Sequence, residues 1–118
     1  MHQKILLCYK LDKEIALKQI AEEEQHKAFT VAYIDNEEAR KSIIEKHNFI
    51  IDYWQRLIET TEAKEKAFLE KLHGIEDQEL KEMAKAYFIE GQSCEEIGRK
   101  YYLERTTVYK RLKRYFDD

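Results

Sequence analysis

The chain has 118 residues, of which 38% are charged and 43% hydrophobic, and it contains no proline and only three glycines. A chain of this length with few helix breakers predicts one globular unit, or a small domain with a helical extension, of the all-α class. The formal net charge of −3 argues against a protein that coats nucleic acid without discrimination.

The first predicted element is a helix from residue 2 to about residue 33, although its apolar stripe is interrupted. The stripe consists of Leu6, Tyr9, Ile15, Ala16, Ile20 and Phe29. A strand over residues 5–11 is an alternative, and residues 29–34 also favour β structure. Because the neighbours of both segments favour helix, we expect helix throughout.

A second, longer helix is predicted from residue 37 to residue 72, after Asp35 and Asn36, either of which can cap it. Its apolar stripe is the most regular in the chain and includes Ile43, Ile44, Ile50, Ile51, Trp54, Leu57 and Ile58. Uninterrupted, this helix would span about 54 Å, so we expect it either to break near Thr60 or to pair with a second copy. These seven residues are therefore the predicted interface of a homodimer. The alternative is a monomer whose two N-terminal helices form a hairpin over the C-terminal part.

The C-terminal part is predicted to contain three short helices. Glu76 and Asp77 begin the first, and Gly91 ends it. Ser93 and Glu96 then form an S-x-x-E capping box, and a short turn separates that helix from the last one. Two short helices joined so closely are typical of a helix-turn-helix, whose second helix enters the DNA major groove. The predicted core comprises Leu80, Ala84, Tyr87, Phe88, Ile97, Tyr101, Val108 and Leu112. The chain would thus divide into a helical body or oligomerisation region (1–73) and a helix-turn-helix domain (74–118).

Charge is distributed unevenly along the chain. From Ile97 to Phe116 there are seven basic residues and one acid, Glu104. Val108 and Leu112 should face inward, which places the polar residues of the last helix on the opposite face. The predicted DNA-binding residues are Arg99, Lys100, Arg105, Thr106, Thr107, Tyr109, Lys110, Lys113 and Arg114. An ordinary solvated helix face is the alternative interpretation, but charge and apolar spacing agree on a DNA-reading face.

The same segment resembles region four of bacterial sigma factors, especially of the extracytoplasmic-function type. The matching residues are Glu95, Glu96, Ile97 and Gly98, followed by Thr107, Val108, Arg111 and Leu112. Residues 75–93 are similar to the preceding helix in small phage and mobile-element proteins, including the ArpU and RinA-type late transcription regulators. The resemblance covers about 45 residues. Two positions depart from the family pattern: Tyr102 replaces the usual turn glycine, and Glu104 replaces the usual serine cap.

The sequence contains no pattern typical of an enzyme, a cofactor site or a metal site. The four histidines are scattered without ligand spacing, and no phosphate loop or nucleophile elbow is present. The widely separated Cys8 and Cys94 are interpreted as free thiols of a cytoplasmic protein, and the apolar run at residues 5–9 is too short for a signal peptide or membrane span.

These observations predict an all-α fold, with long N-terminal helices (a hairpin or coiled coil) followed by a three-helix bundle containing a helix-turn-helix. The predicted function is transcription regulation of phage or mobile-element type, by a homodimer that binds double-stranded DNA through the helix at 105–116. The alternatives are a sigma-like subunit that contacts RNA polymerase, a protein-interaction module with a helix-turn-helix shape, and a recognition subunit for phage DNA packaging.

Overall fold

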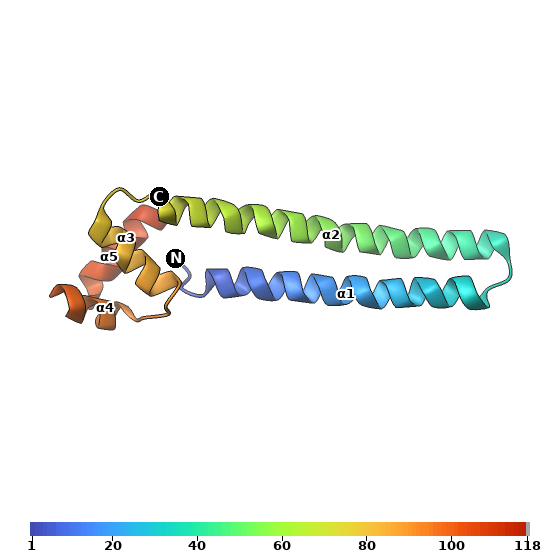
Figure 1. Cartoon of the computed structure of the whole chain (residues 1–118), viewed down its shortest axis with the longest axis horizontal. Coiled ribbons are helices and arrows are strands. Elements are labelled where there is room, and N and C mark those ends of the chain that lie inside the picture. The colour runs from blue at the N-terminus through green and yellow to red at the C-terminus, as the bar shows by residue number, and fades with distance from the viewer. Residues whose placement is uncertain (118) are drawn as a thin grey trace. The chain divides into compact units, whose positions relative to one another are not determined.

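A computed structural model describes residues 1–117 as five helices, and no strand occurs among them (Figure 1). The helices are α1 (Ile5–Tyr33), α2 (Glu37–His73), α3 (Gln78–Phe88), α4 (Cys94–Tyr101) and α5 (Arg105–Phe116). The all-helical prediction is confirmed, and residues 5–11 and 29–33, considered above as strands, lie within α1. Helix α2 continues through Thr60 and Thr61 without a break. No helix in residues 1–117 is both long and apolar enough to cross a membrane.

The chain forms two compact units. The hairpin unit comprises Tyr9–Lys64, and the bundle unit comprises Met1–Cys8 together with Glu65–Asp118. The last turns of α2 and the first turn of α1 thus belong to the bundle unit, whereas the predicted division is a single boundary after residue 73.

In the hairpin unit, α1 and α2 lie antiparallel and face each other along one seam (Figure 1). The less exposed positions recur at alternating steps of three and four residues, which is the spacing of a coiled-coil seam. They are Tyr9, Lys13, Ala16, Ile20, Glu23, Lys27, Thr30 and Ile34 on the α1 side, and Arg40, Ile44, His47, Ile51, Trp54, Ile58 and Thr61 on α2. Nearly half of these side chains are polar, so the seam buries less apolar surface than a seam of the same length made only of apolar residues would.

Polar caps fix the turn between these two helices. The Arg40 guanidinium donates two hydrogen bonds to the carbonyl of Ile34, at 2.8 and 2.6 Å. This carbonyl follows the end of α1, where backbone acceptors lack helical partners and a cation is favourable. The Asn36 side chain accepts a hydrogen bond of 3.0 Å from the Ala39 amide, so the predicted cap at residues 35–36 is confirmed and belongs to Asn36.

The bundle unit contains the hydrophobic core. Its buried members are Leu72, Ile75, Met83, Ala84, Phe88, Ile97, Val108 and Leu112. The predicted core is confirmed in large part. Its predicted members Leu80, Tyr87 and Tyr101 pack against the buried residues but are only partly buried themselves. Met83 of α3 adds to the predicted set. Leu72 and Ile75 also lie outside the predicted core. They belong to the observed core because the end of α2 packs with α3, α4 and α5 instead of remaining with the hairpin.

The N-terminal segment joins this unit through a hydrogen-bonded contact that no sequence pattern indicated. The Gln3 side-chain amide donates to the carbonyls of Tyr87 and Gln92, at 3.2 and 2.8 Å. These acceptors lie at the end of α3 and in the loop after it, where Gly91 has a positive φ of 71°. Gln3 therefore satisfies backbone carbonyls at the point where the chain turns from α3 towards α4.

Candidate nucleic-acid interface

Helices α4 and α5 are joined by only three residues, and both helices begin as their sequences predict. Ser93 caps α4 by accepting a 3.1 Å hydrogen bond from the Glu96 amide. Glu104 occupies the cap position of α5 but makes no side-chain hydrogen bond there. The expected weak cap at Glu104 is thus confirmed.

The connection folds back tightly onto α4. The Leu103 amide donates to the Gly98 carbonyl at 2.9 Å, and a Cβ atom on Gly98 would clash with the Leu103 carbonyl oxygen. Tyr102 is left-handed, with φ 58° and ψ 38°, and its side chain is 96% exposed. A tyrosine in this conformation is strained, as the sequence departure at this position led us to expect.

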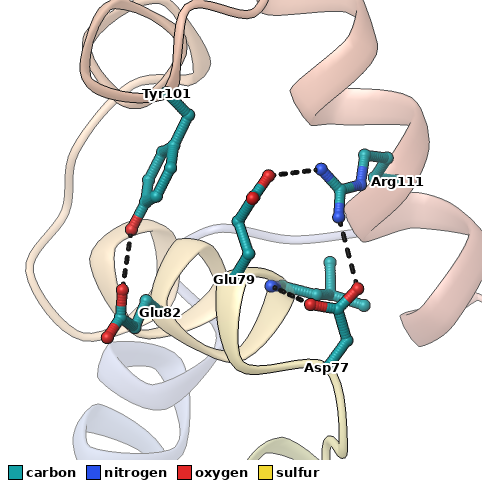
Figure 2. A network of polar contacts seen from close by, with 6 residues as sticks. Asp77, Glu79, Glu82, Tyr101 and Arg111 are labelled. Atoms are coloured by element: carbon teal, nitrogen blue, oxygen red, sulfur yellow. Dashed lines mark hydrogen bonds and ion pairs between the residues drawn. The ribbon is translucent and has the colours of Figure 1, made fainter.

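A polar network fixes α3 against both of these helices (Figure 2). Arg111 of α5 forms ion pairs with Glu79 at 2.8 Å and Asp77 at 3.4 Å, while Asp77 also caps α3 by accepting from the Leu80 amide. The Tyr101 hydroxyl of α4 donates to Glu82 of α3 at 3.1 Å. Arg111 therefore points towards α3, away from the outer face of α5.

The same network perturbs two titrating groups. Hydrogen bonds from Gln78 and Tyr101 to the carboxylate lower the pKa of Glu82. Burial, with a smaller effect from the hydrogen bond to Glu82, raises the pKa of Tyr101. Both shifts favour the pairing of a neutral tyrosine donor with an ionised carboxylate at neutral pH.

The outer face of α5 carries the residues predicted to bind DNA. Arg105, Thr106, Thr107, Tyr109, Lys110, Lys113 and Arg114 are all exposed. Val108 and Leu112 are fully buried, so the predicted helical phase is confirmed. Within residues 1–117, no acidic side chain forms an ion pair with Arg105, Lys110, Lys113 or Arg114. We call the exposed surface of these four basic residues the basic face.

The two predicted residues on α4 are also exposed but have local partners. Arg99 pairs with Glu95 one turn earlier, at 3.2 Å. The Lys100 ammonium lies 5.6 Å from the centre of the Tyr101 ring. The ion pair makes the Arg99 charge less available to an anionic partner. The ring contact does not set Lys100 apart from the basic face, because the Lys113 ammonium lies 5.9 Å from the centre of the Tyr109 ring.

A shallow depression of about 470 Å³ connects the start of α4 to the basic face. It is lined by Cys94, Arg105, Thr106, Tyr109, Lys110 and Lys113. Burial raises the pKa of the Cys94 thiol, which keeps it protonated and a poor nucleophile. Three of the six lining residues are basic, but the lining surface itself is mostly apolar.

Four of the seven predicted oligomerisation residues lie in the seam: Ile44, Ile51, Trp54 and Ile58. Ile51 is buried, whereas Ile43, Ile44, Trp54, Leu57 and Ile58 are half-buried, and only Ile50 is classed as exposed. The exposed aromatic side chains of α2 are instead Phe49 and Tyr53. Helix α1 exposes its own large apolar residues: Leu7, Leu11, Ile15, Leu17, Phe29, Val31 and Tyr33.

Sequence spacing did not reveal one further group of polar side chains. Glu23 and His26 of α1 and His47 of α2 have side-chain ligand atoms that lie within 4.8 Å of one another. Glu23 and His47 are each twelve residues from Asp35 in the turn, so an antiparallel hairpin brings them to the same level. Pairing residues equidistant from the turn would have found the group.

Comparisons with known proteins do not assign the chain to a family. No protein-family model, no curated protein and no solved structure matches it.

Proposed function

We propose that this chain is a sequence-specific DNA-binding transcription regulator of phage or mobile-element type, which reads the major groove with α5. The observation that carries the proposal is the basic face, which has no acidic counterpart within residues 1–117 and lies opposite the buried Val108 and Leu112. A helix face whose positive charges are exposed and not paired with acidic side chains attracts the phosphate backbone of DNA.

The arrangement of α4 and α5 supports a helix-turn-helix interpretation. In that motif the first residues of the second helix reach base edges, while the first helix crosses the phosphate backbone. We accordingly assign base contacts to Arg105, Thr106 and Tyr109, and phosphate contacts to Lys110, Lys113 and Arg114. The residues of α4, Arg99 and Lys100, would contact the flanking backbone.

Arg111 has a different role in this proposal. Although it is basic and lies on α5, it forms ion pairs with Asp77 and Glu79 of α3. It positions α5 against α3 and is not expected to touch DNA. The resemblance to sigma region four includes this arginine, so a stabilising role there is compatible with the same motif.

The proposal predicts how binding changes when charge is removed from α5. DNA bound by the full chain would first be selected from a random pool, and affinity for the selected site would be measured at several salt concentrations. In Lys110→Gln/Lys113→Gln, loss of two phosphate contacts should reduce the slope of log K against log salt by about 1.8. Lys41→Gln/Lys64→Gln removes the same charge from exposed positions of α2 and serves as the control.

The proposal predicts weaker binding and a flatter salt dependence for the α5 variant, with the control close to the parent. Equal effects in both double variants would show that net charge, and not the basic face, governs binding. Failure to select any DNA would contradict the proposal, and binding that requires added RNA polymerase would favour the sigma-like alternative.

A further inference from the structure

Three side chains of types that can coordinate a metal ion meet across the seam of the hairpin unit. Glu23 and His26 are three residues apart on α1, which places them on one face of that helix. His47 approaches them from α2: its Nδ1 atom lies 2.6 Å from the Glu23 carboxylate, and its ring centre lies 6.0 Å from that of His26. Two helices thus contribute one carboxylate and two imidazoles to one place.

The three side chains differ in how firmly they are held. The side chains of Glu23 and His47 are only 17% and 18% exposed, because both belong to the seam. The side chain of His26 is exposed at the edge of the seam. Two donors are therefore held by packing, while the third can rotate and leaves a path by which an ion could enter from solvent.

The donor set fits a divalent transition-metal ion of the Zn²⁺ class. Imidazole nitrogen and carboxylate oxygen are common zinc ligands, with bonds of about 2.0–2.2 Å. Tetrahedral coordination places neighbouring donors about 3.3 Å apart. The three donors are now between 2.6 and 4.8 Å apart, so side-chain rotations would suffice to reach that spacing.

A hydrogen bond between Glu23 and His47 alone is the simpler interpretation of this group. It accounts for two of the residues, but it gives no role to His26, whose ring makes no hydrogen bond within residues 1–117. His26 is therefore the residue that distinguishes a metal site from an ordinary polar pair in the seam.

We propose that Glu23, His26 and His47 bind one divalent transition-metal ion, which links α1 to α2 and leaves a coordination position for water. Because the ligand geometry requires the folded hairpin, binding should stabilise the hairpin unit. The proposal is independent of DNA binding and concerns different helices from the basic face.

Calorimetric titration of the chelator-treated full chain with Zn²⁺ tests the site directly. The parent should bind one ion, and its unfolding midpoint should rise with Zn²⁺ concentration. His26→Gln should weaken binding by at least about 10–100-fold, the loss typical even of residues that only support a ligand. Its midpoint without metal should equal that of the parent, because His26 contributes little to packing. His73→Gln, an exposed histidine elsewhere on α2, is the matched control.

A second arm excludes binding at the cysteine near the N-terminus, where Cys8 Sγ lies 3.6 Å from His2 Nε2. Cys8→Ser should bind Zn²⁺ like the parent, and Co²⁺ bound to the parent should give a visible spectrum without thiolate charge transfer. The proposal is overturned if the parent does not bind Zn²⁺, if His26→Gln binds as tightly as the parent, or if binding requires Cys8.

Discussion

Gly98 and Tyr102 shape the connection between α4 and α5 in opposite ways. At Gly98 the absence of a side chain is essential, since the Leu103 carbonyl occupies the space of a Cβ atom. At Tyr102 a left-handed backbone favours glycine, yet the chain has a large side chain that is almost fully exposed. Tyr102 therefore gains little from packing to offset its backbone strain.

Gly98→Ala should lower the free energy of unfolding by about 1–3 kcal/mol, the usual cost of forcing atoms into a packed site. The added methyl must displace the backbone of the turn, which has no flexible end that can move away. Chemical denaturation of the full chain would measure the change. Lys100→Ala in the same helix should have an effect within about 0.5 kcal/mol. Similar stabilities for both variants would show that the turn is looser than described.

Tyr102→Gly should have the opposite effect and raise the free energy of unfolding by about 0.5–1 kcal/mol, because relief of left-handed strain exceeds the added entropy of the unfolded chain. If the tyrosine ring also contacts DNA, the stabilised variant should bind the selected site more weakly, while Tyr102→Phe retains most of the affinity. Loss of stability in Tyr102→Gly would contradict the strain argument.

At the scale of helices, most features that could be predicted from the sequence depend only on residues that are close together in the chain. Caps at Asn36, Asp77 and Ser93 are formed by side chains next to the helices they begin, so they are visible in the sequence. The phase of α5 follows from its own apolar spacing. These features need no knowledge of which element packs on which.

The features that the sequence did not reveal depend on tertiary pairing. Apolar residues occur around much of α1, so its spacing does not indicate which side faces α2. The meeting of Glu23 with His47 depends on the register of the hairpin, and the Gln3 contacts join residues more than eighty positions apart. The division into units likewise depends on where the end of α2 packs.

Leu112→Ala tests the packing of α5 against the core. Leu112 is fully buried together with Val108, Ile97 and Met83. Its truncation should lower the free energy of unfolding by about 2–5 kcal/mol, through lost burial and a residual cavity. Thermal and denaturant unfolding of the full chain would show this loss, and an unchanged stability would mean that Leu112 is not a core residue.

Arg111→Gln tests the polar attachment of the same helix and should cost far less, about 1 kcal/mol or below. Its partners Asp77 and Glu79 are about half exposed, so solvent screens both ion pairs. The loss should shrink further as salt is added, unlike that of Leu112→Ala. A cost equal to that of Leu112→Ala would indicate that the ion pairs matter more than exposure implies.

For the whole molecule, we propose a dimer that binds DNA at defined sites, and the distribution of charge and apolar surface supports this proposal. Residues 1–92 carry 14 basic and 19 acidic side chains, a net charge of −5, whereas residues 93–118 have a net charge of +2. The acidic part discourages indiscriminate contact with DNA. One short recognition helix reads few base pairs, so a second copy would supply the specificity that a single copy lacks.

The hairpin unit offers the surface for such a dimer. Phe49 is 76% exposed, and Tyr53 lies one turn further along the same face of α2, with Ile50 beside them. Helix α1 exposes further large apolar side chains, among them Phe29 and Tyr33. Apolar area contributes about 25 cal/mol per Å² when it is removed from water, and large exposed patches often mark interfaces. The interface we propose therefore includes Ile50 but lies mainly beside the predicted stripe, most of which faces the seam.

We expect the full chain to sediment as a dimer at tens of micromolar, and Phe49→Gln/Tyr53→Gln to shift it towards monomer without changing its charge. Asn48→Gln/Gln55→Asn alters exposed polar positions nearby and should leave the dimer intact. On DNA, the dimer-weakened variant should lose affinity for two half-sites about 34 Å apart while retaining affinity for one half-site. A parent that remains monomeric would contradict the dimer. A dimer unaffected by Phe49→Gln/Tyr53→Gln would place the interface elsewhere, with the exposed apolar residues of α1 as the next surface to test.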